Sequence, residues 1–75
     1  MKLAVVGAGY VGLVTAAGFA EAKHEVIVFD TSARRIGDLL DGKCPFYEPG
    51  LPELIASNRD RLTFTTSHAD TLQAG

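Results

Sequence analysis

The stretch VVGAGYVGLVTAAGFAEAKHEVIVFD, residues 5–30, passes from β-branched residues through glycines and alanines and back to β-branched residues before an aspartate. Residues 3–6 are a continuous apolar run that ends at a glycine, which is typical of a parallel strand buried on both faces. The sequence EVIVF, residues 25–29, has the β-branched and aromatic composition of a second strand. The stretch therefore predicts two short strands on either side of a longer segment.

The segment between the two strands predicts a helix. From residue 10 to residue 22 the side chains of Val11, Val14 and Phe19 recur at helical spacings among alanines, and polar groups come only at the end. We expect this face of the helix to pack closely on a sheet. Because a strand–helix–strand crossover almost always joins parallel strands in the right-handed sense, residues 3–29 predict a βαβ unit.

A second, shorter helix is expected after Asp30. Ser32 is placed to cap it, Ile36, Leu39 and Leu40 would share its buried face, and residues 41–42, Asp-Gly, would end it. This amphipathic pattern extends the unit to βαβα.

The rest of the chain predicts one more strand. Residues 43–50 hold two prolines and a glycine and predict an ordered loop, and Pro52 suits the first turn of a short helix that follows. The alternating residues 61–66 predict the third strand, and Ser67 or Asp70 would cap a further helix. The expected order is thus βαβαβ with an extra short helix.

Gly7, Gly9 and Gly12 form a GxGxxG motif between the first strand and the first helix. In dinucleotide sites the first glycine permits a tight turn, the second lets backbone approach a pyrophosphate, and the third lets helix and strand pack closely. The start of the helix offers unpaired N–H groups and a partial positive charge to the phosphates. Such a turn can also be purely structural, but the strand before it and the helix after it favour a nucleotide site.

Asp30 ends the second predicted strand eighteen positions after Gly12, close to the spacing of about 20 at which a carboxylate binds the ribose of a dinucleotide. An aspartate there repels a 2′-phosphate, so the sequence favours NAD over NADP. The alternative is that Asp30 only forms a turn or cap. Arg35 is assigned to the adenosine side, although for Arg34 and Arg35 a solvated helix face is the competing interpretation, and an arginine here can also accommodate a 2′-phosphate.

Composition excludes several classes of partner. The chain has 75 residues, with seven Lys and Arg against nine Asp and Glu, so no electrostatic term favours nucleic acid or an anionic membrane. Its apolar runs are far shorter than the roughly 20 residues that span a bilayer. The one cysteine, Cys44, cannot form an internal disulfide, which favours a reducing compartment. We therefore expect a soluble, cytoplasmic chain without a metal site.

Three segments carry a resemblance to a known family: GAGYVGLVTAAGFAEAKHEVIVFD, GKCPFYEPGL and the strand LTFTTS. They resemble the N-terminus of the UDP-glucose/GDP-mannose dehydrogenases over essentially all 75 residues. The resemblance implies an enzyme that oxidises the C6 hydroxymethyl group of a nucleotide sugar to a carboxylate with two NAD. We expect residues 1–75 to form the N-terminal βαβαβ portion of an α/β, Rossmann-like NAD-binding domain, with a three-stranded parallel sheet in the order 3-2-1.

The resemblance also implies a set of site residues. Tyr10 and Val11 would contact the dinucleotide through the glycine turn, Asp30 would hold the ribose, and Arg35 matches a basic position that binds NAD. The catalytic cysteine and lysine of the family lie far downstream, and Cys44 does not match that cysteine. No catalytic residue is therefore expected here, and the isolated chain should be inactive.

Two classes of function remain in competition at this point. The chain is either the N-terminal piece of a nucleotide-sugar dehydrogenase, or a stand-alone nucleotide-binding module that catalyses nothing. A third interpretation is another NAD-dependent enzyme such as a 3-hydroxyacyl-CoA dehydrogenase, although the EPGL segment argues against it. A UDP-sugar is preferred over GDP-mannose as the substrate, and the resemblance implies a homodimer. The uncovered side of the first strand, with Leu3 and Val5, should leave the isolated chain marginally stable.

Overall fold

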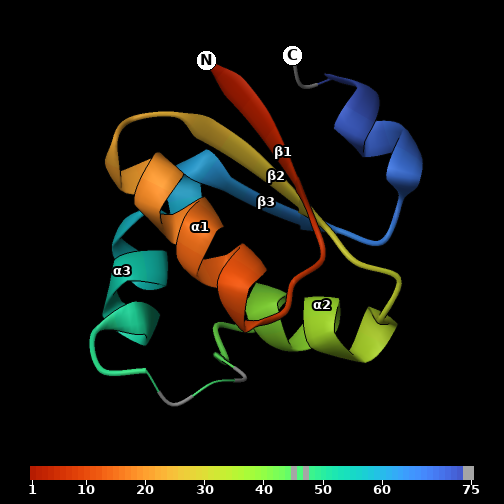
Figure 1. The fold of residues 1–75 in the computed structure, drawn as a ribbon. Helices are drawn as coiled ribbons and strands as arrows, with labels where there is room; N and C mark the ends of the chain where they lie inside the picture. The colour runs from red at the N-terminus through yellow and green to blue at the C-terminus, as the bar shows by residue number, and fades with distance from the viewer. Residues whose placement is uncertain (45, 47, 74–75) are drawn as a thin grey trace.

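The computed structural model describes residues 1–44, 46 and 48–73. Three parallel strands form one sheet in the order β1-β2-β3 (Figure 1), which confirms the predicted βαβαβ order and strand arrangement. Pro45 and Tyr47, which belong to the predicted loop, lie outside the described residues. The elements are β1 (Lys2–Val6), α1 (Tyr10–Glu21), β2 (Glu25–Phe29), α2 (Ala33–Leu40), α3 (Leu51–Ser57), the 3₁₀ turn η1 (Arg59–Arg61), β3 (Leu62–Thr65) and the 3₁₀ helix η2 (His68–Gln73).

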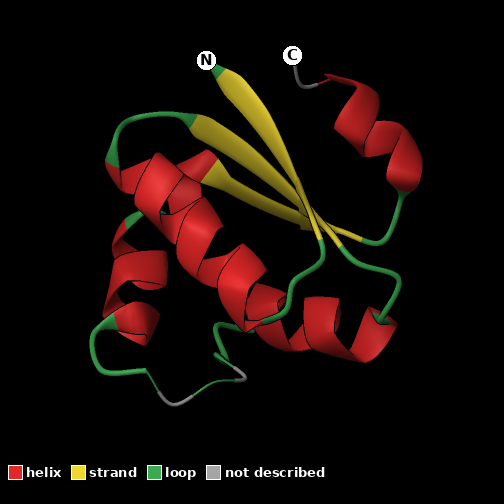
Figure 2. Ribbon diagram, in the orientation of Figure 1, coloured by secondary structure: helices red, strands yellow, loops and turns green. Residues whose placement is uncertain are grey.

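The sheet has two unlike faces, because successive residues of a strand point to opposite sides. Leu3, Val26 and Leu62 are paired across the three strands and share one face. Helices α1, α2 and α3 gather on that side of the sheet, whereas η2 lies apart from them (Figure 2). On the other face the ring of Phe29 meets the ring of His68 from η2 edge-on, with their centroids 5.4 Å apart. The hydrophobic core therefore lies between the sheet and the three α-helices.

Helix α1 packs on the sheet through a face that the sequence analysis did not select. Val11, Val14 and Phe19, the expected contact residues, are exposed, with 74% of the Val11 surface open to solvent. That expectation was wrong, because the helix is apolar on nearly all sides and its periodicity cannot single out one of them. Small alanines bring the helix backbone close to the strands, and Leu13 is the large side chain of α1 that is buried with them. The buried residues of α1 are Leu13, Ala16, Ala17 and Ala20.

Strand β1 is an edge strand of this sheet. Leu3 and Val5 are half-buried on the face that α1 covers, but Ala4 and Val6 are exposed on the other face, Val6 by 70%. The expectation of a strand buried on both faces was thus wrong for the described chain. The exposed apolar side chains of β1 are Ala4 and Val6 rather than Leu3 and Val5, because the latter pair lies on the face that the helices cover.

Helix α2 begins where the sequence predicts. The side chain of Ser32 accepts a hydrogen bond from the backbone N–H of Arg35 at 3.2 Å, which confirms the predicted cap. Ile36 and Leu39 are buried as expected, but Leu40 is exposed because it lies one position further round the helix than Leu39. The helix is therefore amphipathic with a narrower buried stripe than predicted.

The C-terminal elements differ from expectation in detail. Pro52 stands in the first turn of α3, as predicted. Arg61 belongs to η1, so β3 starts one residue later than the sequence suggested. After β3 the chain forms a 3₁₀ helix instead of an α-helix, and Asp70 accepts a hydrogen bond from the Thr65 hydroxyl at 2.7 Å rather than capping it.

Candidate functional site

The glycine turn and Asp30 meet at the carboxyl edge of the sheet. Because all strands are parallel, the loops after β1 and β2 leave the same edge, which is where open α/β sheets bind ligands. The two loops are joined directly, since the Gly7 N–H donates to the Phe29 carbonyl at 2.7 Å. The topology thus places two motifs that are far apart in sequence side by side.

Two glycines of the motif are required by the geometry of the turn. Gly7 has a φ of +98°, in the left-handed region that residues with a side chain rarely adopt. At Gly12 an added Cβ would lie 2.0 Å from the Gly7 carbonyl oxygen, far inside van der Waals contact. Helix α1 therefore approaches the end of β1 more closely than any side chain at residue 12 would allow.

Gly9, the middle glycine of the motif, leaves open space at the start of α1. Gly9 is the N-cap residue, no side chain within the described part of the chain caps the helix, and a Cβ on Gly9 would have no atom within 4 Å. The first helical hydrogen bond runs from Leu13 to the Gly9 carbonyl at 2.9 Å, so the N–H groups of residues 10–12 precede it. This open helix start, with Tyr10 and Val11 exposed beside it, suits a pyrophosphate.

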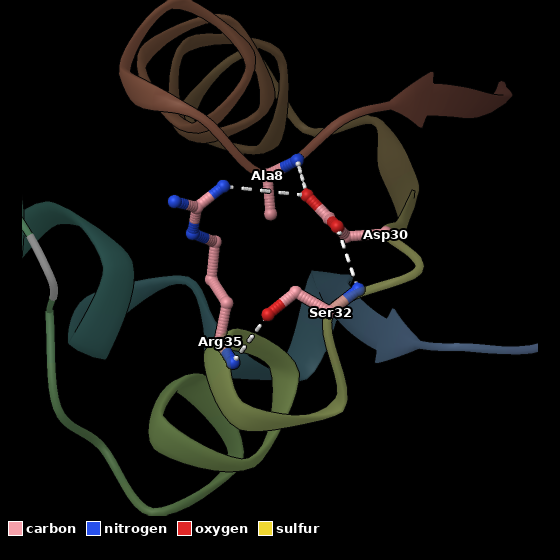
Figure 3. Close-up of polar contacts among 4 residues, drawn as sticks. All are labelled: Ala8, Asp30, Ser32 and Arg35. Atoms are coloured by element: carbon pink, nitrogen blue, oxygen red, sulfur yellow. Dashed lines mark hydrogen bonds and ion pairs between the residues drawn. The ribbon is translucent and has the colours of Figure 1, made fainter.

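The carboxylate of Asp30 holds the two loops together (Figure 3). Its Oδ2 accepts the N–H of Ala8 in the glycine turn, and its Oδ1 accepts the N–H of Ser32, both at 2.8 Å. Nη1 of Arg35 lies 3.6 Å from Oδ2. These N–H donors, with a further contribution from Arg35, lower the pKa of Asp30 and outweigh the effect of partial burial. The carboxylate remains ionised and, with 14% of its side chain exposed, still has lone pairs for ribose hydroxyls.

Arg35 and Tyr10 both contact Phe46, a residue of the loop before α3. The Arg35 guanidinium carbon lies 5.9 Å from the Phe46 ring centroid, and the Tyr10 ring meets Phe46 edge-on at 5.8 Å. The pKa of Tyr10 is raised, first by the acceptor oxygens of the Glu48 side chain, then by desolvation and by the negative charge of Glu48. Phe46 therefore lies against the first turn of α1 and against α2.

The structure separates the expected site residues from other candidates. It brings Gly7, Gly9, Gly12, Asp30 and Arg35 together at one edge, with Tyr10 and Val11 beside them, while Arg34 is exposed on α2. The sequence did not single out Phe46, because its contacts with Tyr10 and Arg35 join residues that are far apart in the chain and follow no local pattern. Glu48 was considered only as an acid or base together with Tyr47, and a hydrogen-bonding role in the loop or at a helix terminus was preferred. The YEPGL segment was the one signal that marked this loop as special.

The remaining candidate features are the cysteine, a metal site and a membrane-spanning helix. Cys44 is half-buried and its Sγ lies 3.4 Å from the Phe46 carbonyl oxygen. The residues that the structure describes contain no group of three or more side chains able to hold a metal ion. Within the same residues no helix is long and apolar enough to cross a membrane.

The chain was compared with known families and proteins. The family model described as "UDP-glucose/GDP-mannose dehydrogenase family, NAD binding domain" matches residues 1–75. The chain belongs to this family. The resemblance drawn from the GYVGL and YEPGL segments is thereby confirmed, as is NAD as the cofactor that this family domain binds.

Similar proteins cover the chain almost completely but are much longer. It is 49% identical over 74 residues to a UDP-glucose 6-dehydrogenase of Pseudomonas aeruginosa, covering 96% of this chain and 16% of that protein. The UDP-glucose 6-dehydrogenase TuaD of Bacillus subtilis is 43% identical over 75 residues, with 97% and 16% covered. A ternary-complex crystal structure of GDP-mannose dehydrogenase from P. aeruginosa superposes with a TM-score of 0.91 at 36% identity, covering 100% of this chain and 18% of that one. The chain thus spans about a sixth of the length of these dehydrogenases.

Proposed function

We propose that residues 1–75 are the N-terminal NAD-binding portion of a nucleotide-sugar 6-dehydrogenase, which oxidises the C6 alcohol of a UDP-sugar to a carboxylate with two NAD. The observation that carries this proposal is the joined turn: Gly12 packs against the Gly7 carbonyl while Asp30 binds the Ala8 N–H. That arrangement presents an open helix start and an ionised carboxylate on one edge, as an adenosine diphosphate requires.

The proposed roles follow from this geometry. Gly7, Gly9 and Gly12 shape the pyrophosphate cradle, and Tyr10 and Val11 line its rim. Their backbone N–H groups at the helix start would bind the phosphate oxygens. Asp30 would accept the ribose hydroxyls, and Arg35 would lie along the adenosine. The list of proposed NAD-binding residues is Gly7, Gly9, Tyr10, Val11, Gly12, Asp30 and Arg35.

When bound, NAD supplies the hydride acceptor for oxidation of the sugar alcohol. The described residues contribute binding and orientation: they hold the adenosine half at the edge of the sheet. We assign no catalytic role to any residue of this chain.

Other features of the whole enzyme are proposed at a coarser level. A UDP-sugar is preferred as substrate because the relatives of 49% and 43% identity are UDP-glucose 6-dehydrogenases, whereas the GDP-mannose enzyme is 36% identical. We further propose a cytoplasmic homodimer that engages neither nucleic acid nor membrane, consistent with the formal net charge of −2. Neither a stand-alone module nor a 3-hydroxyacyl-CoA dehydrogenase is favoured, because the family match covers the whole chain.

Calorimetric titration with NAD and NADP tests the proposal. We expect the wild-type chain to bind NAD more tightly than NADP, and Asp30→Ala to weaken NAD binding by about tenfold, the equivalent of 1.4 kcal/mol. Asp60→Ala, which removes an exposed carboxylate from η1, serves as the matched control and should bind like the wild type. Equal affinity for NADP, or unchanged NAD binding by a folded Asp30→Ala variant, would reject the role of Asp30.

A further inference from the structure

The aromatic ring of Phe46 touches two sides of the candidate NAD site at once. Tyr10 comes from the first turn of α1 and Arg35 from the first half of α2, and both meet this ring at centroid distances below 6 Å. Phe46 is partly buried and packs against the hydrophobic core, which restricts the movement of its ring. It is thus a fixed contact for side chains that the two helices place around the glycine turn.

The guanidinium of Arg35 is restrained by two groups. Its Nη1 lies 3.6 Å from Asp30 Oδ2, and its carbon lies 5.9 Å from the centre of the Phe46 ring. The side chain is 39% exposed, so neither burial nor packing alone fixes it. A cation near an aromatic ring is attracted by the electrons of the ring face, and the Phe46 ring lies within reach of the guanidinium that sits beside Asp30.

This restraint bears on which dinucleotide the site accepts. A 2′-phosphate would place a dianion next to the Asp30 carboxylate, and it would be tolerated only if a cation turned toward it. Arginine is the side chain best suited to bind a phosphate with two parallel hydrogen bonds. To turn two parallel N–H groups toward such a phosphate, the guanidinium of Arg35 would have to rotate from the position that it has beside Asp30 and the Phe46 ring.

We propose that Phe46 is a positioning residue that keeps Arg35 on Asp30, and that it thereby strengthens the preference of the site for NAD over NADP. The inference rests on the proposed function, since it assumes that the adenosine ribose lies at Asp30. A loss of the ring would free the guanidinium for a 2′-phosphate. The preference for NAD over NADP would then fall more than the affinity for NAD itself.

The test compares ADP-ribose with 2′-phospho-ADP-ribose as probes, because they differ only in the group under study. Dissociation constants are measured by calorimetry for the wild-type chain and for Phe46→Ala, Phe46→Leu and Phe46→Tyr. Leucine keeps an apolar side chain but has no ring, whereas tyrosine keeps the ring. Phe19→Ala is the matched control, since Phe19 is an exposed aromatic residue at the far end of α1 that meets His24. Circular dichroism establishes that each variant is folded.

The measured quantity is the dissociation constant of 2′-phospho-ADP-ribose divided by that of ADP-ribose. We expect this ratio to fall about fivefold in Phe46→Ala and Phe46→Leu, the size of one cation–π contact. Phe46→Tyr and Phe19→Ala should keep the wild-type ratio. An unchanged ratio in folded Phe46→Leu, or equal weakening of both probes, would overturn the inference and leave the proposed function standing. Absence of ADP-ribose binding by the wild type would overturn both.

Discussion

At the residue scale, Gly12 sets how closely α1 approaches the end of β1. We predict that Gly12→Ala destabilises the chain by about 3 kcal/mol or more, because the new Cβ would meet the rigid Gly7 backbone at 2.0 Å. Gly18→Ala in the same helix is the matched control: a Cβ there enters open space. That control should stabilise the chain by about 1 kcal/mol through helix propensity. Urea denaturation measures both, and equal effects of the two substitutions would contradict the close packing.

Asp30 makes the free energy of unfolding depend on pH in the acidic range. Its pKa is lowered in the folded chain, so its stabilising contribution is complete above the unfolded pKa of about 3.9 and is lost as the pH falls through the lower folded value. We predict that Asp30→Asn costs about 1–3 kcal/mol at pH 7, because an amide cannot accept both N–H groups. The difference from wild type should shrink below pH 4. A difference that is constant from pH 7 to pH 3 in denaturant titrations would show that the ionised carboxylate is not what joins the loops.

At the scale of single elements, α1 ends with a residue in an unfavourable conformation. Lys23 has a φ of +78°, its N–H donates to the Ala20 carbonyl, and the His24 N–H donates to Phe19 at 3.1 Å, which together close the helix. Lys23→Gly should stabilise the chain by about 1 kcal/mol, because glycine adopts this conformation without a steric penalty. Lys23→Ala retains the Cβ and should change little. A thermal melt that shows no gain for the glycine variant would contradict the assigned end of the helix.

The elements also show how far local sequence signals reach. The strands, the Ser32 cap and Pro52 could be predicted because each depends on neighbouring residues. The buried face of α1 could not be predicted, since Val11 and Leu13 are equally apolar. The short distance between helix and sheet decides the face, because it requires small alanines beside Leu13. At the site, the glycines and Asp30 follow from spacing, whereas the contact of Phe46 with Arg35 joins two residues that no local pattern relates.

At the scale of the whole molecule, the edge strand β1 is exposed to solvent on the face away from the α-helices. Ala4 and Val6 are uncovered there, and an apolar edge strand tends to pair with another chain. We predict that the 75-residue chain associates with increasing concentration and that Ala4→Lys weakens this association about tenfold by placing a charge on the edge. Ala56→Lys adds the same charge at an exposed position of α3 and should have no effect. Sedimentation of a stable monomer at all concentrations would contradict the prediction.

We propose above all that the carboxyl edge of the sheet binds the adenosine-pyrophosphate half of NAD. The most direct measurement is a titration of the ¹⁵N-labelled chain with ADP-ribose, followed by amide chemical shifts. We expect saturable shifts at residues 7–12 and 30–35, with little change in α3 or η1. Shifts centred on residues 51–61, or the absence of any saturable change in a folded chain, would contradict it.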